Sequence, residues 1–162
     1  MTFCSLYSWK INNVQFEASK FSRQILKKIE LSYGKFYFLK NVIVSEIDEG
    51  VVFDFTKAKP VIEEAIKFYG RNARLGYVSN RINTYSVAPQ DWNKFYNERY
   101  CIRAMALVAY TPMGQTNIMI EQLFIKNRVE RFNSLEFAVH WIQAQLEPQP
   151  VEACSSLLKE TA

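Results

Sequence analysis

The pattern of hydrophobic and polar positions along the chain predicts alternating strands and helices. Several apolar runs have the length of a strand and are bounded by polar turns such as Lys40-Asn41. The run 102–110 is nearly all apolar, which is typical of a central strand covered on both faces. The predicted strands are 36–39, 42–47, 75–79, 102–110 and 129–132, with 51–53 as a short strand or the lead-in to a helix.

The first amphipathic helix is predicted over 56–69, where apolar residues recur at helical spacing from Val61 to Tyr69. Gly70 follows at the position of a left-handed terminating residue. Pro60 is unfavourable inside a helix, so we expect the regular helix to begin about there.

Three more helices are predicted later in the chain. One begins at Pro89 and one at Thr111-Pro112, because proline is favourable at the first helical position. The last helix is expected to be capped by Asn133, with Phe132 packed against Phe137.

The order of elements is a β-meander followed by α, β, α, β, α, β, α. This order predicts an α/β fold, a mixed sheet with about four helices packed on it and right-handed crossovers. We expect one domain over 25–146, preceded by an irregular extension (1–24) and followed by a polar tail (147–162).

Composition narrows the class of protein. The chain has 162 residues, 49% of them hydrophobic, and a net charge of +4. Its basic residues form no dense stripe interleaved with aromatic residues, so nucleic-acid binding is not expected. No apolar run approaches the ~20 residues that span a bilayer, no signal peptide is evident, and three widely spaced cysteines fit a reducing compartment. We therefore expect a cytoplasmic protein.

The chain offers few groups for chemistry. His140 is its single histidine, and no second histidine or cysteine lies at ligand spacing, so neither a metal site nor a His-based catalytic site is expected. None of the five glycines belongs to a phosphate-binding motif. We expect no enzyme activity, no catalytic residue and no cofactor.

The loop after the strand at 75–79 concentrates hydrogen-bonding side chains at the carboxyl end of a strand, where ligands bind in such sheets. Local turn bonding of Asn and Ser explains the loop equally well. Read as a site, it would bind a partner or ligand through Ser79, Asn80, Arg81, Asn83, Tyr85, Ser86 and Trp92.

The element order, the polar loop after YVSN and the ending VERFNSLEFAVHWI together resemble the STAS superfamily. The similarity is to its SpoIIAA-like branch of uncharacterised bacterial proteins, whose fold also resembles the lipid-binding CRAL-TRIO fold. The resemblance covers about 25–146 and implies a non-enzymatic regulatory module that binds a protein partner. It also implies a phosphorylation site near this loop, for which Ser79 and Ser86 are the nearest counterparts, although neither has the flanking Asp and Gly of the family.

The loop residues and the resemblance leave two candidate functions. The first is the STAS-like module with its partner bound at 79–86. The alternative is a carrier of a small apolar or lipid-like ligand in a groove lined by Phe68, Phe95, Met113 and Met119. A homodimer through a sheet edge or the aromatic N-terminal extension is a further hypothesis.

Overall fold

The computed structural model describes residues 13–98 and 102–148 and confirms the α/β class. Six strands form a mixed sheet in the order β1-β2-β3-β5-β7-β8. The first three are antiparallel, and β3, β5, β7 and β8 run parallel to one another. Their bounds are β1 Lys27–Leu31, β2 Gly34–Phe38, β3 Val42–Ile47, β5 Leu75–Arg81, β7 Ile102–Ala109 and β8 Arg128–Phe132.

A smaller sheet pairs β4 (Val52–Phe53) with β6 (Ser86–Val87) in parallel. It ties the loop after β5 to the segment that leads into the first helix. The two edges of the main sheet are β1 and β8. Dimerisation through one of them stays a prediction.

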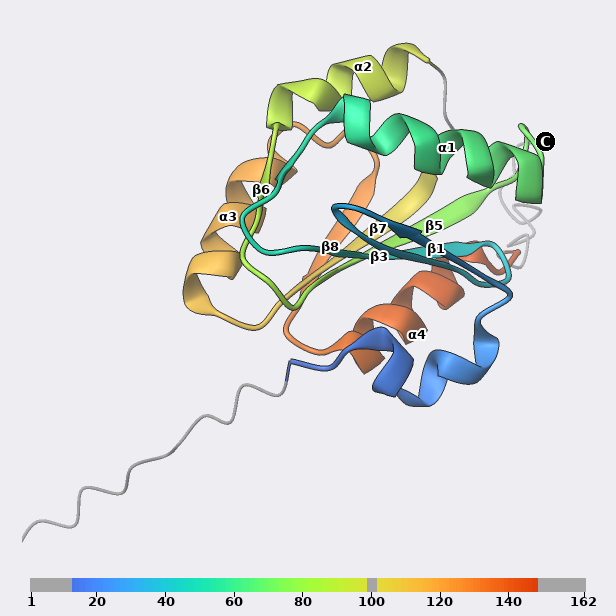
Figure 1. The fold of residues 1–162 in the computed structure, drawn as a ribbon, viewed down its shortest axis with the longest axis horizontal. Coiled ribbons are helices and arrows are strands. Elements are labelled where there is room, and N and C mark those ends of the chain that lie inside the picture. Colours follow the sequence, from blue (N-terminus) through green and yellow to red (C-terminus); the bar gives the residue numbers. More distant parts are fainter. Residues whose placement is uncertain (1–12, 99–101, 149–162) are drawn as a thin grey trace, which may run out of the picture.

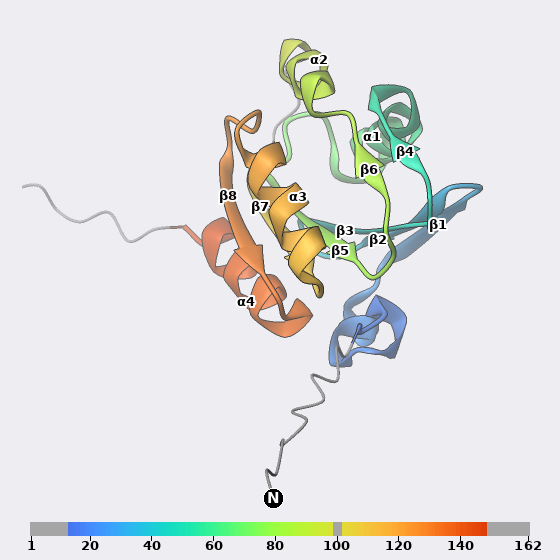
Figure 2. The same cartoon turned by 90° about the vertical axis from the view of Figure 1, so that its left-hand side faces the viewer.

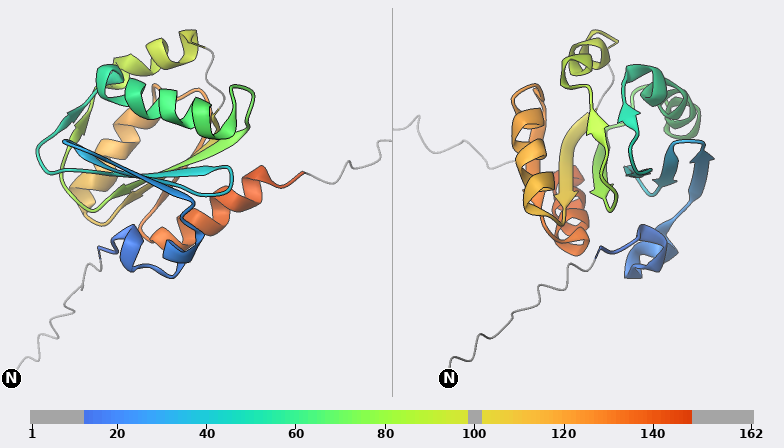
Figure 3. Two further views of the ribbon diagram at one scale, coloured as in Figure 1. Left: turned by 45° about the vertical axis from the view of Figure 1, so that its right-hand side comes forward. Right: turned by 60° about the vertical axis from the view of Figure 1, so that its left-hand side comes forward.

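Helices cover both faces of the main sheet (Figures 1 and 3). One face carries α1 (Phe55–Tyr69), α2 (Trp92–Asn97), which follows the short 3-10 helix η3 (Pro89–Asp91), and α3 (Pro112–Gln122). The other face carries α4 (Leu135–Leu146) and two short 3-10 helices, η1 (Phe16–Ala18) and η2 (Lys20–Gln24).

The side chains of the central strands alternate between these two layers. Val42 and Val44 of β3 belong to the core beneath α4, whereas Ile43 and Ile47 belong to the core beneath α1. The central strands β3, β5 and β7 are therefore buried on both faces, as the apolar run at 102–110 predicted for β7.

The start of α1 differs from the prediction. The helix begins at Phe55, because the Asp54 carboxylate accepts a hydrogen bond from the Lys57 N–H at 3.0 Å. Pro60 lies inside the helix, where its missing N–H removes a single backbone bond. Gly70 ends the helix at φ 91°, as predicted.

The start of α4 also differs. Ser134, not Asn133, caps the helix by accepting a hydrogen bond from the Phe137 N–H. The Phe137 side chain is exposed, so the predicted contact with Phe132 does not protect it from solvent.

The predicted extension over 1–24 is wrong in its second half, because residues before 25 belong to the core. Phe16 and Phe21 are buried in the cluster formed with α4. The aromatic residues of this segment follow neither a helical nor a strand period, so the sequence pattern gave no indication that they are buried. They lie in short 3-10 turns, which have neither of those periods. Residues 1–12 and 149–162 lie outside the described residues.

Gly76 shows how closely α4 approaches the sheet. A Cβ atom added at Gly76 would lie 2.6 Å from the Ile142 Cγ1 atom. We predict that Gly76→Ala lowers the free energy of unfolding by about 1–3 kcal/mol through overpacking. Chemical denaturation measures this loss. In the double variant Gly76→Ala/Ile142→Ala, the loss of unfolding free energy should be clearly smaller than the sum of the losses in the two single variants. A loss equal to that sum would contradict the contact.

Candidate functional site

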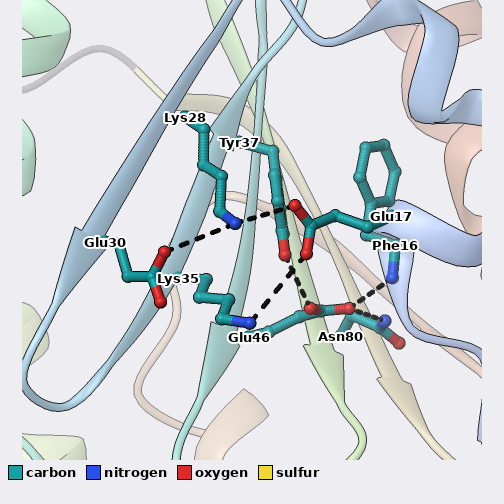
Figure 4. Close-up of polar contacts among 8 residues, drawn as sticks. All are labelled: Phe16, Glu17, Lys28, Glu30, Lys35, Tyr37, Glu46 and Asn80. Carbon is teal, nitrogen blue, oxygen red and sulfur yellow. Dashed lines mark hydrogen bonds and ion pairs between the residues drawn. The ribbon is translucent and has the colours of Figure 1, made fainter.

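Polar side chains gather at the carboxyl ends of β3 and β5, and they lie on both faces of the sheet. Beneath η1, the buried Glu46 carboxylate accepts three hydrogen bonds (Figure 4). Its Oε1 atom accepts the Phe16 N–H at 2.6 Å and the Asn80 side-chain amide at 2.7 Å. Its Oε2 atom accepts the Tyr37 hydroxyl at 3.1 Å. A buried carboxylate is tolerated because these donors replace its water.

Asn80 is the centre of this network. Its Nδ2 group also donates to the Val14 carbonyl at 2.8 Å, and its Oδ1 atom accepts the Tyr110 hydroxyl at 2.7 Å. Burial raises the pKa of Tyr110 to about 12, so the hydroxyl remains a donor at neutral pH. The amide thus joins the N-terminal segment, β3 and β7 through β5.

The opposite face of the same strand ends carries a second network. Arg81 forms an ion pair with Glu121 of α3, with both side chains almost fully buried. The Arg81 Nε–H also donates to Ser79 Oγ at 3.3 Å, and Ser79 shares a 2.7 Å hydrogen bond with the Tyr85 hydroxyl. Burial raises the pKa of Tyr85, an effect that the Arg81 charge partly offsets.

These contacts show which of the predicted site residues are buried and which are exposed. Ser79, Asn80 and Tyr85 are buried and bonded inside the protein. The Asn83 side chain donates to the Ile47 carbonyl at 3.0 Å. Ser86 is exposed in β6. Of the two predicted phosphorylation sites, Ser86 is at the surface and Ser79 is not, and modification of either remains a prediction.

A cavity of about 140 Å³ lies on the face of the sheet that α1 and α2 cover. Its lining runs along α1, from Phe55 at the start of the helix to Gly70 at its end. Gly70 and Arg71 are exposed, so the lining reaches solvent at that end. Most lining side chains are apolar, among them Phe36, Val61, Ala65, Leu75, Phe95 and Met105.

The polar side chains in this lining mostly have partners already. The Asp91 carboxylate accepts the Phe55 N–H at 2.9 Å, and the Tyr77 hydroxyl is bonded to Ser45 at 2.6 Å. Asp54 caps α1. Trp92 is different: across residues 13–98 and 102–148, its indole Nε1 is the single buried side-chain nitrogen or oxygen without a hydrogen-bond partner.

Two residues from the two predicted sites line this cavity. Phe95, expected to line a groove, and Trp92, expected in a site, both line it. The other three predicted groove residues do not line it: Phe68, Met113 and Met119 are exposed. Val61 and Ala65 belong to the predicted apolar face of α1, and the sequence pattern does not distinguish a helix face that fills its layer from one that leaves a gap.

An exposed apolar surface covers α3 and the turn after it; Figure 2 shows the helix beside β7 and β8. We call it the α3 surface, and it consists of Met113, Met119, Ile120, Leu123 and Phe124. Leu123 is 82% exposed. Between 111 and 125 the one ionisable residue is Glu121, which is buried against Arg81. The α3 surface therefore carries no charge.

The structure offers little for metal chemistry within its described part. No group of three or more His, Cys, Asp or Glu side chains there could hold a metal ion. His140 is a surface residue of α4, 3.8 Å from the Glu136 carboxylate. Cys4, Cys101 and Cys154 lie outside the described residues.

Comparisons with protein-family models, with curated proteins and with solved structures gave no match to this chain. Among the described helices, none combines the length and the apolar character needed to cross a bilayer.

Asn80→Asp tests the network around Glu46. The substitution places a second carboxyl group against Oε1, so one of the two must hold a proton and its pKa rises above the unfolded value of about 4. The folded state then binds more protons than the unfolded state, and stability falls as pH rises. We predict a loss of about 3 kcal/mol at pH 7 that shrinks towards pH 4.

Denaturant titrations across that pH range measure the loss, with Glu46→Gln as the matched control. The control removes the charge while keeping an acceptor for the two N–H groups, so its cost should be smaller and nearly independent of pH. A pH-independent loss in Asn80→Asp would contradict the contact.

Proposed function

We propose that this chain is a non-enzymatic binding protein that holds a small, largely apolar molecule in the cavity between the sheet, α1 and α2. The observation that carries the proposal is a cavity of about 140 Å³ whose lining is almost entirely apolar. An enclosed apolar cavity of about this size accepts molecules such as benzene, and this cavity, which reaches solvent beside Gly70, offers similar space. Ligand sites are typically apolar with a few polar groups, and this one has that character.

The shape of the lining indicates what kind of molecule fits. It follows α1 over 55–70, which corresponds to roughly 20 Å of helix at about 1.5 Å per residue. Each buried methylene contributes about 0.8 kcal/mol to binding. Affinity should therefore rise with the length of the apolar part until the cavity is full.

The exposed end of the lining supplies a route for entry. Gly70 and Arg71 are at the surface, whereas at the start of α1 the Phe55 N–H donates to the Asp91 carboxylate and joins the helix to the segment before α2. A ligand that enters beside Gly70 would cross no strand of the main sheet.

Ala65→Phe tests the cavity directly. Ala65 is buried on the inner face of α1 and lines the cavity, so a phenyl ring there would fill the space that a ligand needs. We predict at least tenfold weaker binding of small apolar probes, measured by calorimetry. The matched control is Ala144→Phe, an exposed position of α4, which should bind as the parent chain does. Equal affinity in both variants would contradict the proposal.

A second function, protein-partner binding of the STAS-like kind, is supported by the α3 surface. Exposed apolar residues that gather on one element mark interaction sites more often than scattered apolar residues do. The surface lies beside the predicted loop, to which the Arg81–Glu121 ion pair joins it. Because the surface has no Lys or Arg, it suits an uncharged apolar protein surface better than an anionic membrane.

Leu123→Glu tests this second function. The substitution adds a charge to the centre of the α3 surface and should abolish recovery of a specific partner in affinity capture. Leu26→Glu is the matched control, because Leu26 is also exposed, at 62%, but lies before β1. Loss of the partner in both variants, or in neither, would contradict a site on α3, and binding to lipid vesicles would identify a membrane instead.

A further inference from the structure

We infer that the ligand of this cavity carries one neutral hydrogen-bond acceptor, which the indole N–H of Trp92 recognises. The inference rests on the proposed function and adds the chemical class of the ligand. Small ketones, aldehydes and esters with an apolar body belong to this class.

The indole N–H of Trp92 is an unpaired donor. Its nitrogen is buried and has no hydrogen-bond partner, although Trp92 lines the cavity. Buried donors in folded proteins almost always have a partner, and an exception calls for an explanation such as an acceptor supplied by a bound molecule. A bound molecule in the cavity can supply that acceptor.

The indole ring of Trp92 is held rigidly. The Trp92 indole contacts the rings of Phe95 and Tyr96, with centroid separations of 5.6 and 6.3 Å. The Tyr96 hydroxyl accepts the Lys126 N–H at 2.8 Å, and Asp91 holds the start of α2 against α1. The donor is therefore fixed in place before a ligand arrives, which lowers the entropic cost of using it.

The charged side chains near Trp92 indicate the charge of the acceptor on the ligand. Asp54 and Asp91 line the same end of the cavity as Trp92, and each carboxylate is already bonded to a backbone N–H. Lys57 and Lys94 pair with these two carboxylates, at 3.5 and 2.9 Å, and among the described residues the lining at this end includes no Lys or Arg. No cation of the described lining is therefore present beside the indole to attract an anionic group, and a neutral carbonyl or ether oxygen is enough to accept the N–H.

The test uses two probes of nearly equal shape, acetophenone and α-methylstyrene, which differ by a carbonyl oxygen in place of a methylene group. Calorimetry gives their affinities for the full chain and for Trp92→Phe, which keeps an aromatic ring and removes the N–H. We expect Trp92→Phe to weaken acetophenone roughly tenfold and α-methylstyrene less than twofold.

Trp141→Phe is the matched control, because Trp141 packs in the core on the opposite face of the sheet. It should change neither affinity. In ¹⁵N-labelled protein, acetophenone should also move the indole N–H resonance of Trp92 downfield, and α-methylstyrene should not.

The outcomes separate the two proposals. If the parent chain binds both probes and Trp92→Phe weakens them equally or not at all, the acceptor inference is overturned and the cavity remains a binding site. If the parent chain binds neither probe, the proposed function is contradicted, and so is the inference that rests on it. Binding of α-methylstyrene to Trp92→Phe also shows that the variant is folded.

Discussion

The fold depends on one constraint: the central strands β3, β5 and β7 are buried on both faces, so a helical layer must fill each face. Beneath α4 the fit is tight, because Gly76 leaves no room for even one more carbon atom against Ile142. On the other face, α1, α2 and α3 share the same area of sheet, and a cavity remains between α1, α2 and the strands. Protein interiors rarely leave such space, so the gap is the feature to explain.

The polar end of the sheet has a different role from the one predicted. Glu46 and Asn80 on one face, and Arg81 and Glu121 on the other, are buried and satisfied by one another and by backbone groups. Removing one member would leave a buried polar group or charge unpaired, which costs far more than the pair contributes. These networks hold the N-terminal segment and α3 against the sheet.

The sequence predicted the elements well because strand and helix periods are local properties. The apolar run at 102–110 and the Gly70 stop signal were enough to place β7 and the end of α1. It failed where several local signals compete, as at Pro60 and at the Asn133-Ser134 pair, where two adjacent residues could each cap a helix.

The candidate site was harder to predict because it depends on contacts between distant segments. Asn80 and Arg81 have the composition of a binding loop, yet their partners Glu46 and Glu121 lie 34 and 40 residues away. The lining of the cavity looks like ordinary core in sequence. Trp92 was singled out as a contact residue, but its unpaired N–H becomes apparent once the surrounding atoms are placed.

The central claim is that the space between α1, α2 and the sheet is an apolar binding cavity. Diffraction from crystals of the full chain under xenon pressure tests it most directly, because xenon enters dry apolar cavities. We predict a xenon peak against Val61, Ala65 and Leu75. A chain of ordered waters in that space, or side chains that close it with no xenon peak, would contradict the claim.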